Sequence, residues 1–172
     1  MFLKIIIAVR DMKKIVLILC LLWIGFIAFN TSQSGTVSNN TSVSITEKLV
    51  NKTQDIFNKN EGSNSYINSS EFIRKLNKLI RKFAHGFEFL VLAILISFAL
   101  ESFNIKNREV IIYTLFFVLL YAVIDEFRQI YIPGRNSNVK DIVIDFIGGI
   151  GGVIIFQCVF ICKNIYLKKK SR

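Results

Sequence analysis

His85 and Glu88 are polar residues one helical turn apart inside a long apolar run, where such groups are costly unless they have a use. A spacing of three residues places both on one face of a helix, and His85 is the only histidine in the chain. A histidine beside a carboxylate can take up a proton or hydrogen-bond a ligand. The pair therefore marks a candidate site for binding or for acid–base chemistry.

Further polar residues stand at the end of one apolar run and at the start of the next. The sequence DEFRQ, residues 125–129, ends the first of these runs. Asp141 and Asp145 open the second run and share a helical face because they are four residues apart. Gly148 and Gly152 continue that face, where small residues let another helix approach closely.

The connection between these two runs contains the sequence IPGRN, residues 132–136. Proline presets one φ angle and glycine accepts a positive one, so this segment is predicted to form a tight turn. Arg128 and Arg135, before and within the turn, supply counter-charges for the carboxylates. The charged segment is thus predicted to be two helix ends joined by a turn.

Chain direction brings these polar groups to one place. In an up-and-down bundle, the start of the second span, the end of the third and the start of the fourth lie at the same membrane face. Polar groups in hydrocarbon are expensive, so they are expected to turn inward and meet. We therefore predict one ligand-binding site made of His85, Glu88, Asp125, Glu126, Gln129, Arg135, Asp141 and Asp145.

Three kinds of role fit such a cluster. It can bind an anionic amphiphile, with Arg128 and Arg135 meeting the head group. It can catalyse a reaction on an envelope lipid or peptide, in which case the catalytic candidates are His85, Glu88 and Asp125, and Asp125 with Asp141 could orient the base or hold a hard divalent cation. It can also be an ion-pair cluster that only locks the helices together. No metal-binding spacing is present, so neither a metal ligand nor a cofactor is predicted.

The elements that position these residues are four apolar blocks. The chain of 172 residues is 52% hydrophobic with a mean hydropathy of +0.48, and each block approaches the ~20 residues needed to cross ~30 Å of hydrocarbon. We predict an all-α integral membrane bundle of four transmembrane helices plus one amphipathic interfacial helix. Its parts are an N-terminal extension (1–12), a first spanning helix (13–29), a polar extracytoplasmic loop (30–69), the amphipathic helix (70–82), a core of three spanning helices (83–162) and a basic cytoplasmic tail (163–172).

Two details of the ends and of the cysteines complete this outline. Met12 is followed by two lysines and an apolar run, so it is predicted to be an alternative start of the chain. Cys20, Cys158 and Cys162 lie inside spanning blocks in no zinc-binding pattern, and packing is the role expected for them.

The net charge of +10 comes from basic residues that flank the apolar blocks. That placement suits the lipid bilayer as partner, with anionic lipid beside the helix ends, and it argues against nucleic acid. Lysines and arginines are equally many on the two predicted sides, eleven each. The short basic start and the KKK tail predict that both termini lie in the cytoplasm. We expect a multi-pass protein of the bacterial plasma membrane.

The motifs together resemble the VanZ-like family of small bacterial membrane proteins. The matching pieces are NTSQ at 30–33, K-x-x-H-x-x-E-F at 82–89, D-E-x-x-Q at 125–129 and P-G-R-x5-D-x3-D-x2-G at 133–148. Gly86 and Asp145 depart from the pattern, which often has an aromatic residue and an asparagine there. The resemblance implies a cell-envelope protein, and the founding member is associated with resistance to the antibiotic teicoplanin. It thus agrees with an outward-facing cluster, and under the binding hypothesis the candidate ligands are a lipoglycopeptide and an anionic lipid-linked wall precursor.

Overall fold

Four long helices make up the part of the chain that the structure describes. The structure, a computed structural model, describes residues 2–33, 43, 69–135 and 137–170. Its helices are α1 (Phe2–Ser32), α3 (Ser69–Ser102), α4 (Asn107–Gln129) and α5 (Val139–Lys170), and the described residues contain no strand. The all-α prediction is therefore confirmed, while most of the predicted polar loop (30–69) lies outside the described residues.

Each of the four helices is long and apolar enough to cross a bilayer. The apolar stretches cover residues 13–32, 75–102, 107–129 and 139–166. The shortest helix, α4, has 23 residues, which at ~1.5 Å per residue gives about 35 Å, against ~30 Å of hydrocarbon. The prediction of four transmembrane helices is confirmed.

Side-chain burial in the bundle is what a lipid environment requires. A small core of aliphatic and aromatic side chains is buried where the helices meet: Ile27, Phe89, Leu92, Ala93, Val118, Ala122 and Val153. Many large apolar side chains face outward instead, among them Leu21, Phe116 and Ile147, each about 60–70% exposed. Water would not tolerate so much exposed apolar surface, whereas hydrocarbon does. The chain is a multi-pass membrane protein.

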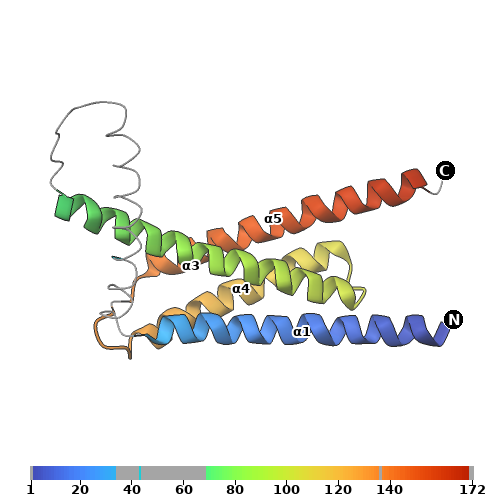
Figure 1. Cartoon of the computed structure of the whole chain (residues 1–172), viewed down its shortest axis with the longest axis horizontal. Coiled ribbons are helices and arrows are strands. Elements are labelled where there is room, and N and C mark those ends of the chain that lie inside the picture. Colours follow the sequence, from blue (N-terminus) through green and yellow to red (C-terminus); the bar gives the residue numbers. More distant parts are fainter. Residues whose placement is uncertain (1, 34–42, 44–68, 136, 171–172) are drawn as a thin grey trace, which may run out of the picture.

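The helices run back and forth, so both termini lie at one end of the bundle (Figure 1). The end of α1 and the connection from α4 to α5 lie at the opposite end. The contact between α3 and α5 is the most extensive in the bundle. The two helices can approach closely because Gly148 and Gly152 have no Cβ atom. A Cβ on Gly148 would overlap the carbonyl oxygen of Gly86, and one on Gly152 would overlap that of Leu90.

Three helices extend beyond the boundaries expected from composition. The predicted amphipathic helix (70–82) and the second span form one continuous helix, α3, without a break at residue 83. The predicted basic tail is also helical as far as Lys170, where α5 ends. Residues 2–12 of the predicted extension are helical and belong to α1, which begins at Phe2.

Candidate functional site

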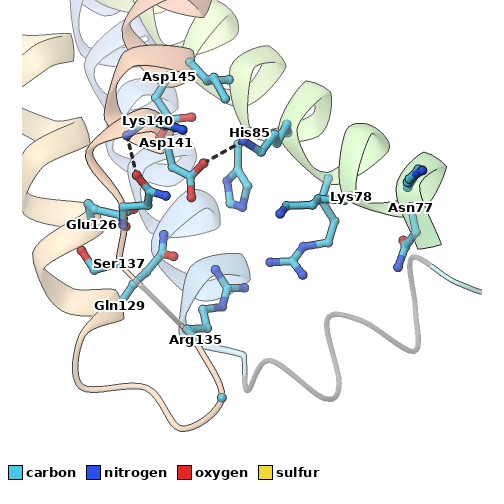
Figure 2. Close-up of a pocket in the computed structure, with 16 residues that line it drawn as sticks. Asn77, Lys78, His85, Glu126, Gln129, Arg135, Ser137, Lys140, Asp141 and Asp145 are labelled. Carbon is cyan, nitrogen blue, oxygen red and sulfur yellow. Dashed lines mark hydrogen bonds and ion pairs between the residues drawn. The ribbon is translucent and has the colours of Figure 1, made fainter. Parts of the chain in front are cut away.

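A cavity of about 810 Å³ opens at the end of the bundle opposite the termini. Its walls are the first half of α3, the end of α4, the α4–α5 connection and the start of α5 (Figure 2). Six of the eight predicted site residues line it: His85, Glu126, Gln129, Arg135, Asp141 and Asp145. The other two, Glu88 and Asp125, are not among its lining residues.

A tight turn directs Arg135 toward the cavity. The backbone N–H of Arg135 donates to the carbonyl oxygen of Ile132 at 3.2 Å, and Gly134 between them has a φ of 76°. Proline at the second position and a positive φ at the third define a type II turn. The predicted turn is confirmed, and Figure 2 shows Arg135 entering the cavity from this connection.

Two hydrogen bonds at Asn138 fix the end of the α4–α5 connection that precedes α5. The carboxylate of Glu126 accepts from the backbone N–H of Asn138, which ties the connection to α4. The side-chain oxygen of Asn138 accepts from the backbone N–H of Lys140 at 3.0 Å. Asn138 is therefore the N-cap of α5, and Asp141, one turn further on, is free for another use.

Asp141 and Asp145 both face the cavity from the first turns of α5. Asp141 forms an ion pair with Lys82 of α3, at 3.4 Å. Asp145 is only 5% exposed, and its buried Oδ1 has no hydrogen-bond partner among the described residues. The two carboxylates on one helical face therefore have different surroundings.

The charge of the cavity is predominantly positive. Three acidic residues line it, against six basic ones: Lys75, Lys78, Arg81, Lys82, Arg135 and Lys140. The guanidinium of Arg135 donates to the carbonyl oxygen of Asn30 at 3.4 Å, but its buried Nε and Nη1 have no partner in the described part of the chain. Burial, and then the nearby charge of Arg81, lower the pKa of Arg135 from its ordinary value.

Asp125 serves a different purpose, because it bonds α4 to α1. Its carboxylate is 1% exposed and accepts from the hydroxyl of Thr31 at 2.7 Å and from Gln129 at 3.0 Å. Arg128 lies 3.4 Å from the same carboxylate and also donates to the hydroxyl of Ser32 at 2.7 Å. Arg128, expected to meet a ligand, is instead used in this contact.

Glu88 has an equivalent role on α3. Its Oε1 accepts from the side-chain amide of Asn30 at 2.7 Å, and its backbone carbonyl accepts from the indole N–H of Trp23 at 2.9 Å. Its Oε2 lies 3.4 Å from Nδ1 of His85. We call the contact of Asn30, Thr31 and Ser32 with Glu88, Asp125 and Arg128 the α1 clasp.

The predicted cluster therefore divides into a closed clasp and an open cavity. Residues 30–32 were predicted as the start of the polar loop and as part of a motif shared with the family, and their role as partners of the acids was missed. The only signal was their position at the end of the first apolar block, level with the acids in an up-and-down bundle. Of the three catalytic candidates, His85 alone lines the cavity, with Glu88 behind it and Asp125 in the clasp.

The basic residues of α3 were also missed as site residues, since they were expected to contact the bilayer surface. Lys75, Lys78 and Lys82 precede His85 by ten, seven and three residues, and Arg81 precedes it by four. These spacings place all of them on the helical face that carries His85. The signal was present in the sequence once α3 is recognised as one continuous helix.

The donor set of the cavity favours anions over metal ions. Within the described ranges, no three or more His, Cys, Asp or Glu side chains converge so that they could hold a metal ion. Asp125 and Asp141, considered as joint cation ligands, are separated between the clasp and the cavity. What the arrangement can do is receive a negatively charged group among lysines and arginines.

Comparison with known proteins places this architecture in a family. No curated protein and no solved structure matches the chain at a significant level. The sequence model of the family described as VanZ/LLP1 matches residues 16–161. That range covers most of the chain and includes the α1 clasp and all eight predicted site residues, so the chain belongs to the VanZ/LLP1 family.

Proposed function

We propose that this protein binds an amphiphile at the outer leaflet of a bacterial plasma membrane and holds its anionic head group in the cavity. Suitable ligands are a lipid-linked cell-wall precursor and a lipoglycopeptide of the teicoplanin type. The observation that carries the proposal is the cavity itself, with six basic residues and the incompletely paired guanidinium of Arg135. Membership of the VanZ/LLP1 family supports the membrane setting.

The chemistry of the cavity suits a carboxylate or a phosphate. A guanidinium offers parallel N–H donors that match two oxygens of either group, and such charge-assisted bonds are stronger than neutral ones. Among the described residues, Nε and Nη1 of Arg135 have no hydrogen-bond partner, so N–H donors of this guanidinium remain available to such a group. On α3, Phe83 and Phe87 are exposed at the level of the cavity, where the apolar part of an amphiphile would remain in the bilayer.

The test is binding to purified protein in uncharged lipid nanodiscs, with teicoplanin and a short-chain polyprenyl phosphate as two separate probes. We expect Arg135→Gln to weaken binding of the accepted probe by about tenfold or more, as for a lost bond between charged groups. Lys163→Gln is the matched control, since Lys163 is a basic residue at the opposite end of the bundle, paired with Glu101. Equal affinities of Arg135→Gln and wild type, or no binding of either probe, would reject the proposal.

Catalysis on an envelope lipid or peptide is the second candidate function, and one observation favours it. His85 lines the cavity while Glu88 lies behind it at 3.4 Å, an arrangement in which a carboxylate orients a general base. The same nanodiscs, loaded with extracted envelope lipids, allow mass spectrometry of any product. A product that His85→Gln abolishes supports catalysis, and unchanged lipids exclude it for the lipids used.

A further inference from the structure

Two buried groups of opposite charge face the cavity without pairing with each other. Asp145 comes from α5, is 5% exposed, and its Oδ1 lacks a hydrogen-bond partner among the described residues. Arg135 comes from the α4–α5 connection, and the same part of the chain offers no partner for its Nε and Nη1. Burying such groups without partners is costly, so their surroundings are incomplete as they stand.

The other acidic residues of the cavity already have partners. Glu126 accepts from the backbone of Asn138, and Asp141 pairs with Lys82. Within the described part of the chain, Asp145 is thus the cavity carboxylate with a buried oxygen that lacks a partner, and a cation on a ligand would complete it. In Figure 2, Asp145 lies toward one side of the cavity and Arg135 toward the other, with Asp141 and Gln129 between them.

We propose that the cavity recognises a zwitterionic head group, with its phosphate or carboxylate at Arg135 and a primary ammonium at Asp145. This inference rests on the proposed function and narrows its ligand class. A primary ammonium both carries positive charge and donates hydrogen bonds to a carboxylate. A quaternary ammonium cannot donate, and a purely anionic head group leaves Asp145 without a cationic partner.

Three short-chain phospholipids that share a phosphodiester separate these cases. Phosphatidylethanolamine carries a primary ammonium, phosphatidylcholine a quaternary one, and phosphatidylglycerol none. The nanodiscs are made of an uncharged lipid without phosphate, so that the bilayer does not compete with the probes. With wild-type protein, we expect phosphatidylethanolamine to bind at least about tenfold more tightly than the other two. Asp145→Asn should remove that preference, while Arg135→Gln should weaken all three lipids. Glu101→Gln, a carboxylate replacement at the opposite end of the bundle, is the matched control.

Each outcome separates this inference from the proposed function. If wild type binds phosphatidylglycerol as tightly as phosphatidylethanolamine while Arg135→Gln weakens both, the zwitterion inference is overturned and anion binding stands. If no lipid shows a dependence on Arg135, both fail. Should Asp145→Asn not fold, the wild-type order of the three lipids decides alone. Asp145→Glu, which keeps the carboxylate, then checks that the preference follows this charge.

Discussion

Asp125 illustrates at the residue scale how a buried charge can be structural. Its carboxylate accepts from Thr31, Gln129 and Arg128 and so joins α4 to α1. Asp125→Ala leaves the hydroxyl of Thr31 and the charge of Arg128 without this partner. We expect it to lower the free energy of unfolding by about 3 kcal/mol, the range for removing one member of a buried pair. Denaturant titration of the purified protein measures this change.

An exposed ion pair provides the control for Asp125. Nζ of Lys163 lies 3.3 Å from the carboxylate of Glu101 at the other end of the bundle, and the side chain of Lys163 is 58% exposed. Exposed pairs contribute little, so Lys163→Gln should change the free energy of unfolding by less than about 1 kcal/mol. If Asp125→Ala were no more destabilising than Lys163→Gln, the α1 clasp would have no structural role.

The sequence predicted that these polar residues lie close together, but not that they divide between the α1 clasp and the cavity. Helical spacing and chain direction correctly placed Asp141, Asp145 and His85 at one end of the bundle. They could not show that Asp125 turns toward α1, because spacing gives the face of a helix and not the neighbour that covers it. Arg128 was assigned to a ligand for the same reason. The partners in residues 30–32 are far away in sequence, so only the folded chain reveals them.

At the scale of elements, glycine determines how closely α3 and α5 pack. We call this helix contact the seam. A Cβ on Gly148 would overlap the backbone carbonyl of Gly86, which cannot rotate away as a side chain could. Gly148→Ala must therefore push α3 and α5 apart. Overpacking of this kind costs about 1–3 kcal/mol, and the cavity between the same helices should lose affinity for its ligand. Thermal unfolding and ligand titration of the variant measure the two effects.

Gly151 gives a matched control on the same helix. A Cβ there would lie 3.6 Å from a methyl group of Leu90, an ordinary contact. Since alanine favours helix over glycine by about 1 kcal/mol, Gly151→Ala should be neutral or stabilising. Equal unfolding temperatures for the Gly148→Ala and Gly151→Ala variants would contradict the role assigned to the seam.

The sequence predicted the elements better than their surroundings. Four apolar blocks were sufficient to count the spanning helices, and the small residues at 148 and 152 correctly indicated a close approach. The basic face of α3 was predicted to lie on the bilayer surface, and its place in the cavity wall was not predicted, because lysine and arginine beside an apolar block look the same whether they meet lipid head groups or a cavity. What decides between them is α5, whose first turns lie against that face.

At the scale of the whole molecule, the distribution of positive charge bears on orientation. The predicted assignment of lysines and arginines to the two sides of the membrane gives eleven on each side, so a simple count is uninformative. Six basic residues at the end opposite the termini line the cavity, where the proposed anionic ligand would account for them. At the end with the termini, by contrast, basic residues such as Lys14, Arg108 and Lys169 are exposed. Exposed charge beside the spans is what retains a segment in the cytoplasm.

The exposed basic residues beside the termini predict that the cavity faces outward, and cysteine labelling in intact cells tests this orientation. In a variant with Cys20, Cys158 and Cys162 replaced by alanine, single cysteines are introduced as Tyr131→Cys and Lys169→Cys. Tyr131 is 73% exposed beside the cavity, and Lys169 is exposed near the end of α5. A membrane-impermeant maleimide should label the first before lysis and the second only after it. The reverse pattern would place the cavity in the cytoplasm and exclude direct contact with a ligand at the outer leaflet.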